Sequence, residues 1–287
     1  MFRLVKKQQL LLTAGAALLF VLFYFVSPTV APDKHIHTEG DTSHSHVNQS
    51  IRFEDLLVKA KEKISPEQAA RIGMLENAVV RGDIKEQQIH VYHQLARFWS
   101  DSARIFEPYA WYTAEAAKLE NSEKSLTFAA HLFLNNLMTE GEPAMQNWLA
   151  SQAKVLFDKA LVLNPANDSS KIGLGACYLF GNISDNPMQG IMSIRSVVEK
   201  NPDNVYGQMM LGLGGKKSGQ YDKAIERFLI VVKKDPENLD AIFNLAECYD
   251  IHNEKANAIK WYEIAKEKVP VAAAKEALSK RIAELKR

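Results

Sequence analysis

The pattern of apolar, small and polar residues repeats near the C-terminus with a period of 34 residues, in the stretches 205–238 and 239–272. Both stretches place large apolar residues at helical spacing, with small residues between them and a proline near the end. The corresponding pairs are Leu211 and Leu245, Gly212 and Ala246, Ala224 and Ala258, and Phe228 and Tyr262. A hairpin of this size cannot bury its own apolar face and therefore stacks on its neighbours. The pattern predicts an all-α array of helical hairpins with an extended binding surface rather than a catalytic cleft.

The second stretch resembles the tetratricopeptide repeat, whose consensus combines large, small and aromatic positions in a fixed order. The residues that carry the resemblance are Ile242, Leu245, Ala246, Tyr249, Ala258, Tyr262, Ala265 and Pro270. Small residues are needed where the two helices of a hairpin cross, and the proline ends the second helix. The resemblance implies a right-handed α-solenoid, an all-α fold of stacked hairpins.

Looser copies of the pattern precede these two. One copy begins near Leu174 and has a hairpin loop lengthened by residues 182–187. Another has its first helix at 123–137, and a further copy begins near Tyr92. The resemblance therefore predicts an array of about five hairpins over residues 86–272. Capping helices are expected on both sides, at 51–85 and 273–287, because solenoids need polar-backed ends for solubility.

One departure from the repeat pattern concerns Gly215. This residue stands where the repeat has a bulky aromatic side chain, and it follows Gly214 directly. Each glycine inside a helix costs about 1 kcal/mol relative to alanine. Two interpretations remain open: Met209, Met210 and the next hairpin fill the space, or the glycines leave a small pocket on the array.

The N-terminus predicts a membrane anchor. Arg3, Lys6 and Lys7 lie in a short tail, residues 1–8, and an apolar segment follows at 9–27. As a helix such a segment can cross a bilayer, and the basic residues hold the tail in the cytoplasm. A cleaved signal peptide is the rival interpretation, and the length of the apolar core favours the anchor. We therefore expect a single-pass protein of the inner (cytoplasmic) membrane whose repeats face the periplasm.

Residues 28–50 are expected to form a flexible linker, because they are rich in Pro, Thr, Ser, Asp and His and poor in apolar side chains. The linker contains His35, His37, His44 and His46. Neutral imidazoles at this density can capture zinc, copper or nickel. A solvated tether is the favoured interpretation, since a strong site also needs supporting groups that orient its ligands. We predict no metal site.

The remaining composition argues against several classes of function. Lys plus Arg number 35 against 34 Asp plus Glu, a balance that disfavours binding to nucleic acid. No Ser, Cys or His occurs in a pattern typical of a nucleophile with its base. His90 and His93 have a spacing that suits a shared metal, but lining of a binding groove is favoured. Cys177 and Cys248 are expected in the core. The sequence thus predicts a chain with no enzymatic activity and no cofactor.

The resemblance also implies which side chains line the groove formed by the first helix of each hairpin. In this sequence they are His93, Arg97, Thr127, His131, Tyr206, Met209, Leu213, Lys216, Lys217, Asp240, Phe243, Asn244 and Glu247. The set mixes both charges with apolar residues, which suits an extended or helical polypeptide. Capture of a C-terminal carboxylate is disfavoured, because only Asn244 matches the residues that the family uses for it.

The leading hypothesis is a membrane-anchored scaffold that binds a protein or peptide partner in this groove during assembly or translocation of envelope proteins. An alternative is an accessory subunit of cytochrome c maturation that holds the apocytochrome. A second alternative, a metal-handling protein, depends on the histidines of the linker. Self-association into a homo-oligomer through exposed hairpins also remains open.

Overall fold

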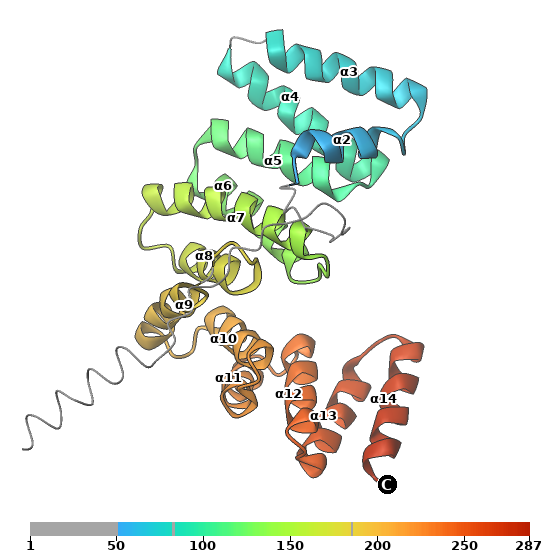
Figure 1. Cartoon of the computed structure of the whole chain (residues 1–287), viewed down its shortest axis with the longest axis vertical. Coiled ribbons are helices and arrows are strands. Elements are labelled where there is room, and N and C mark those ends of the chain that lie inside the picture. The colour runs from blue at the N-terminus through green and yellow to red at the C-terminus, as the bar shows by residue number, and fades with distance from the viewer. Residues whose placement is uncertain (1–50, 82–83, 185) are drawn as a thin grey trace, which may run out of the picture. The chain divides into compact units, whose positions relative to one another are not determined.

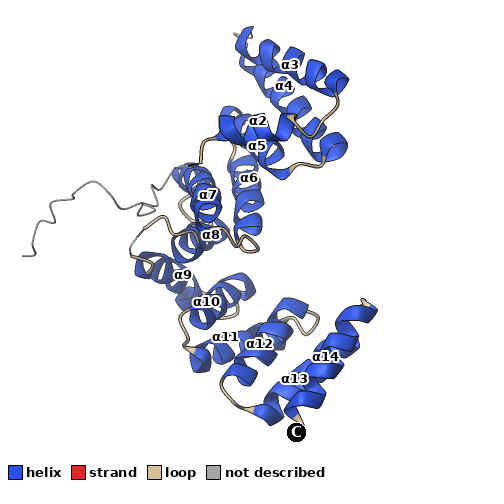
Figure 2. Ribbon diagram, turned by 45° about the vertical axis from the view of Figure 1, so that its right-hand side comes forward, coloured by secondary structure: helices blue, strands red, loops and turns tan. Residues whose placement is uncertain are grey.

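The structure, a computed structural model, describes residues 51–81, 84–184 and 186–287. Within these ranges the chain is all-helical, with thirteen α-helices, one π-helix and no strand (Figures 1 and 2). In chain order the elements are α2 (Phe53–Lys61), α3 (Pro66–Arg81), α4 (Lys85–Arg97), η1 (Phe98–Ala103), α5 (Phe106–Glu120), α6 (Glu123–Leu137), α7 (Pro143–Leu163), α8 (Asp168–Phe180), α9 (Met188–Lys200), α10 (Val205–Lys217), α11 (Tyr221–Lys234), α12 (Leu239–Ile251), α13 (Lys255–Lys268) and α14 (Ala272–Leu285).

The predicted tail, membrane anchor and histidine-rich linker, residues 1–8, 9–27 and 28–50, lie outside the described residues. None of the helices in the described ranges combines the length and the apolar character that crossing a membrane requires. The localisation inferred from the N-terminus therefore remains a prediction.

Consecutive helices pair into hairpins, and each hairpin packs against the next one along the chain (Figure 1). The pairs are α4 with α5, α6 with α7, α8 with α9, α10 with α11, and α12 with α13. The first helices also meet one another, because α8 contacts both α6 and α10, and α10 contacts α12. The predicted fold class, an α-solenoid of stacked hairpins, is confirmed.

An asparagine cap fixes the start of the first helix in three successive hairpins. The side-chain oxygen of Asn204 accepts from the backbone N–H of Gly207 at 2.8 Å, and Asn238 accepts from Ala241 at 3.0 Å. Asn167 does the same for Ser170 at 2.8 Å. Each cap satisfies a backbone donor that a helix N-terminus otherwise leaves unpaired. A proline two residues earlier has already ended the preceding helix, so the turn between hairpins is set locally.

Small residues allow the two helices of a hairpin to approach closely. A Cβ atom on Gly212 of α10 would lie 2.6 Å from the Phe228 ring of α11, closer than any side chain tolerates. In the next hairpin Ala246 and Ala258 are fully buried at the equivalent places. The predicted role of the small positions as helix crossings is confirmed at these sites.

The buried apolar residues form two clusters. The first runs from α2 to α10 and is centred on large side chains such as Trp99, Phe133 and Phe157. The second runs from α11 to α14 around Phe228. Met209 and Leu213 of α10 pack against both clusters. Cys177 and Cys248 are free and buried, as expected of core residues.

Polar contacts hold the helices at both ends of the array. Ser65 and Gln68 exchange hydrogen bonds at the start of α3 and so form a capping box. Glu76 of α3 accepts from Lys61 at 2.6 Å and from the Tyr112 hydroxyl at 3.0 Å. At the other end α14 buries Leu278, Ile282 and Leu285, which confirms an amphipathic C-terminal helix.

Candidate functional site

The first helices of the five hairpins, α4, α6, α8, α10 and α12, are called the row of first helices below. Predicted groove residues of α6 and α10 lie close together within this row. The Thr127 hydroxyl lies 3.0 Å from the Ser170 hydroxyl on α8. His131 Nε2 lies 3.0 Å from the Ser169 hydroxyl, and its ring stands edge-on to Tyr206 of α10 with centroids 5.7 Å apart. The structure therefore brings Thr127, His131 and Tyr206 together on one face of the array.

Burial keeps this part of the row uncharged. Desolvation lowers the pKa of His131, so its imidazole is neutral at pH 7. Desolvation likewise raises the pKa of Tyr206, whose buried hydroxyl has no hydrogen-bond partner among the described residues. These two rings therefore act as packing surfaces between hairpins.

The predicted lysines of α10 are already engaged within the chain. Lys216 donates to Asn244 Oδ1 of α12 at 2.7 Å and also pairs with Glu247. Lys217 donates to the carbonyl oxygen of Leu179 at 3.2 Å and lies over the Phe180 ring. Burial lowers the pKa of Lys217. The sequence places Lys216, Asn244 and Glu247 in the groove, but it does not show that Lys216 pairs with Glu247 and donates to Asn244.

The remaining predicted groove residues of α10 and α12 are Met209, Leu213, Phe243 and Asp240. Met209, Leu213 and Phe243 are partly buried and pack against the apolar clusters. The carboxylate of Asp240 is exposed at the start of α12, and its backbone carbonyl accepts from Asn244 at 2.8 Å. The part of the row that α10 and α12 form thus offers a mostly neutral surface.

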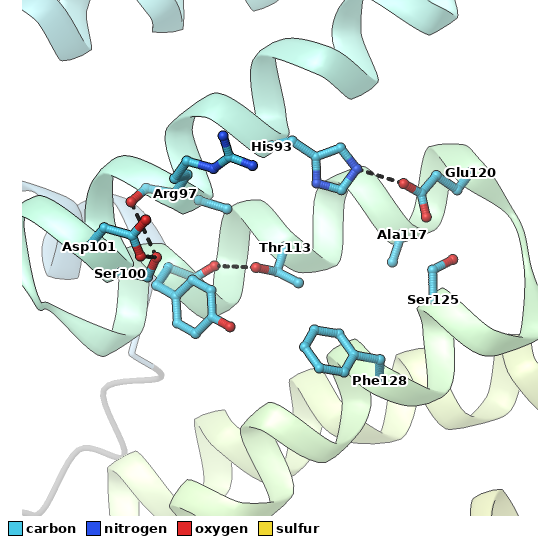
Figure 3. A pocket seen from close by; sticks show the side chains of 11 residues that line it. His93, Arg97, Ser100, Asp101, Thr113, Ala117, Glu120, Ser125 and Phe128 are labelled. Atoms are coloured by element: carbon cyan, nitrogen blue, oxygen red, sulfur yellow. Dashed lines mark hydrogen bonds and ion pairs between the residues drawn. The ribbon is translucent and has the colours of Figure 1, made fainter.

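A pocket of about 300 Å³ opens between α4, η1, α5 and α6, and it includes the two predicted groove residues of α4 (Figure 3). Its lining is His93, Ala96, Arg97, Ser100, Asp101, Tyr109, Thr113, Ala117, Glu120, Ser125 and Phe128. The π-helical turn η1, with Arg104 in the left-handed conformation after it, sets this wall of the pocket. π-Helical turns inside α-helices occur frequently at functional sites.

Arg97 is the cation that this pocket leaves available. Its guanidinium forms no hydrogen bond or ion pair with any residue in the described ranges, and the side chain is exposed. In Figure 3 the guanidinium extends toward His93, and the Phe128 ring lies on the other side of the pocket. Phe128 is 55% exposed, a high value for a large apolar side chain. A cation and an apolar ring thus face the same space.

The other polar groups of the pocket are held in place by local contacts. His93 Nε2 lies 2.7 Å from Glu120 Oε1. Thr113 donates to the Tyr109 carbonyl at 2.8 Å, and the Ser100 hydroxyl donates to Asp101 at 2.6 Å (Figure 3). A second hollow, of about 360 Å³, shares Arg97 and Asp101 with the first. The pocket can therefore take an acidic or aromatic side chain of a bound polypeptide.

Sequence reasoning found His93 and Arg97 but missed Phe128 and the residues of α5. A signal for Phe128 exists, because a large aromatic residue directly follows the predicted groove residue Thr127. The π-helical turn that shapes the pocket leaves no comparable mark in the sequence.

The two histidines of α4 do not converge on a metal. His90 Nε2 lies 3.1 Å from the amide of Gln94, whereas His93 pairs with Glu120. No group of three or more potential metal ligands occurs among the residues that the structure describes. The linker histidines lie outside those residues.

Residues 209–273 match the family model described as tetratricopeptide repeat. A curated human protein, "Interferon-induced protein with tetratricopeptide repeats 2", is 31% identical over 127 residues, which make up 42% of this chain and 26% of that protein. The chain therefore spans about a quarter of the length of this curated relative.

Solved structures with a similar arrangement include TTC0263, a thermophilic TPR protein from Thermus thermophilus, at 16% identity and a TM-score of 0.49, covering 70% of this chain and 98% of that one. MamA from Desulfovibrio magneticus RS-1 is 22% identical with a TM-score of 0.44, covering 65% and 96%. YrrB, "a TPR protein with an unusual peptide-binding site", is 19% identical with a TM-score of 0.41, covering 66% and 91%. Residues 209–273 therefore match tetratricopeptide repeats, and they form part of a longer array of stacked helical hairpins.

Proposed function

We propose that this chain is a non-enzymatic scaffold that binds a polypeptide partner along the row of first helices, with the pocket around Arg97 and Phe128 as its principal anchor. The observation that carries the proposal is the pairing of an unengaged guanidinium with a 55% exposed aromatic ring across one pocket. Arginine and aromatic residues dominate the binding energy of protein interfaces. Elsewhere in the row the charged groups are largely satisfied within the chain, so partner selection rests on this pocket.

The chemistry of the pocket selects the class of segment. A carboxylate of the partner can pair with Arg97 through two parallel hydrogen bonds. An apolar or aromatic side chain beside that carboxylate can pack on Phe128. The His93–Glu120 pair and Asp101 add polar groups at the edge of the pocket. The preferred partner is therefore an extended segment with an acidic and an apolar residue close together.

Photocrosslinking in cells tests this proposal. A photoreactive residue replaces Phe128 in the full-length chain, and Val162 of α7, which is 80% exposed, serves as the matched position away from the row. We expect a discrete protein to be trapped at position 128 and not at 162. Adding Arg97→Glu should abolish that product. Equal products at both positions, or a product that survives Arg97→Glu, would refute the pocket as the anchor.

The site of action follows from the N-terminal sequence. We infer that residues 9–27 anchor the chain in the inner membrane and that the repeats act on envelope proteins in the periplasm. Membrane fractionation with protease protection tests this inference: repeats degraded only after the outer barrier is opened would agree with it, and recovery in the soluble cytoplasm would contradict it. A trapped partner with a Cys-x-x-Cys-His motif would assign the scaffold to cytochrome c maturation.

A further inference from the structure

A further pocket lies between the second helices α9 and α11, and the first helices α8 and α10 also contribute to its lining. It has a volume of about 170 Å³ and none of the predicted groove residues lines it. Four apolar residues come from α8, α9 and α10, and three cations come from α9 and α11. The lining is Leu179, Met188, Ile191, Arg195, Leu211, Gly214, Gly215, Ser218, Gln220, Lys223 and Arg227.

The glycines at the end of α10 allow the neighbouring residues to pack closely beside this pocket. A Cβ atom on Gly214 would lie 2.6 Å from Leu179, and one on Gly215 would lie 3.3 Å from Ala224 of α11. Leu179 of α8 and Ala224 of α11 therefore approach the bare backbone of these glycines closely. Of the two interpretations of Gly215 drawn from the sequence, the small pocket is present, whereas the atoms nearest to a Cβ at Gly215 belong to Ala224 of the same hairpin rather than to Met209, Met210 or the next hairpin.

The charges at this pocket are of one sign. Lys223 donates to the neutral amide of Gln220 at 2.7 Å, and Arg227 donates to Gln208 at 3.0 Å. Arg195 forms no side-chain hydrogen bond or ion pair within the described part of the chain. None of the described residues that line the pocket is acidic. Three cations without carboxylate partners create a local positive potential that attracts an anionic ligand.

The apolar lining and the volume of the pocket further restrict the class of ligand that it can bind. Met188 is 52% exposed, whereas Leu179 is buried and Ile191 and Leu211 are partly buried in the lining. Pockets that enclose whole small molecules measure about 300–1,000 Å³. A hollow of about 170 Å³ is too small for these and suits one apolar side chain. Anchoring of a single side chain, with charges around it, is typical of a bound peptide segment.

We propose that this pocket is a second docking site, which takes an apolar side chain from an acidic polypeptide segment and holds its flanking carboxylates with Arg195, Lys223 and Arg227. The site does not depend on occupancy of the pocket around Arg97, since the two share no residue. The chain can thus hold two acidic segments at once, or two segments of one partner.

Fluorescence anisotropy on the full-length chain tests the proposal. The probe is a labelled short peptide with Leu-Phe at its centre and glutamates on both sides. Peptides with lysines in place of the glutamates, or Ala-Ala in place of Leu-Phe, serve as controls. We expect saturable binding of the acidic apolar probe alone. Binding should weaken as salt shortens the Debye length from about 10 Å at 0.1 M to about 3 Å at 1 M.

Variants locate the binding. In the Arg97→Glu background, which removes the acidic-segment site of the first pocket, Arg195→Glu with Lys223→Glu should weaken binding at least about tenfold, the factor that 1.4 kcal/mol produces. Lys200→Glu with Lys233→Glu makes the same change in net charge at exposed sites outside the pocket and should leave affinity unchanged. Met188→Glu places an acid at the exposed rim and should also weaken binding.

Three outcomes would overturn the proposal. They are absence of saturable binding to the wild-type chain, equal affinity of the two double variants, and loss of binding with Arg97→Glu instead. Vesicles of phosphatidylglycerol and phosphatidylcholine distinguish a membrane from a peptide. Binding to vesicles that depends on Arg195 and Lys223, without binding to the peptide, would assign the surface to lipid and refute peptide docking.

Discussion

The C-terminal helix α14 is held against the last hairpin by polar contacts whose contribution to stability can be tested. Asp250 of α12 accepts two hydrogen bonds from the Arg281 guanidinium of α14, at 2.7 and 2.8 Å, and one from the Tyr262 hydroxyl at 3.1 Å. The Asp250 side chain is 10% exposed, whereas Arg281 is 46% exposed. Because the guanidinium is partly solvated, the Asp250–Arg281 pair contributes less to the stability of the docked helix than breaking a fully buried pair would cost.

We therefore expect Asp250→Asn to destabilise the docking of α14 by about 1–2 kcal/mol, and Asp250→Ala by about 2–3 kcal/mol because it also leaves the Tyr262 hydroxyl without its acceptor. In a repeat array the last helix contacts only the adjoining hairpin, here α12 and α13, so the loss appears as local opening rather than global unfolding. Amide hydrogen exchange across residues 272–285 should accelerate about tenfold in the first variant and up to about a hundredfold in the second.

The pH dependence of this docking has a definite sign. Hydrogen bonds from Arg281 and Tyr262 lower the pKa of Asp250 in the folded chain. The stabilisation is therefore complete above the ordinary aspartate pKa of about 3.9 and is lost as the pH falls through the lower folded value. Glu267→Gln, which removes a charge from an exposed position on α13 outside these hydrogen bonds, is the matched control. Unchanged exchange in Asp250→Ala, or equal acceleration in Glu267→Gln, would refute the reasoning.

Three further predictions concern packing within the array. Phe157→Ala removes a fully buried ring and should cost about 3–5 kcal/mol in urea unfolding, whereas a loss below about 1 kcal/mol would contradict its central place. Gly212→Val should cost at least about 1–3 kcal/mol, because its Cβ would lie 2.6 Å from Phe228, whereas Gly73→Ala, with nothing within 4 Å, should be neutral or stabilising. Burial raises the pKa of the Cys177 thiol to about 12, so alkylation at pH 8 should await unfolding, and rapid labelling of the native chain would contradict this.

The positions of the helices could be predicted from local signals in the sequence, namely capping residues and small residues. The helix 123–137 begins at Ser122, whose hydroxyl caps it, and the helix after Ser65 begins with a capping box. Small residues at Gly212 and Ala246 marked helix crossings because packing tolerates nothing larger there. The asparagine caps that start α8, α10 and α12 were equally present in the sequence, although the repeat pattern was found without them.

The candidate site was predicted only in part. The period placed His93, Arg97, Thr127 and His131 on first helices, because positions that recur at a fixed spacing share one face of an array. It could not show which charges remain available. Lys216 meets Glu247 across 31 positions in sequence, and that pairing depends on the distance between two hairpins.

The sequence by itself determined that this chain is a stack of helical hairpins, since periodicity, caps and small residues act within one or two turns of a helix. Only the tertiary structure decided where the surface is open. The pocket around Arg97 needs a π-helical turn and three further helices, and the pocket beside Gly215 needs residues of α8, α9, α10 and α11 to come together. Such spaces depend on how separate elements fit together, which no local pattern encodes.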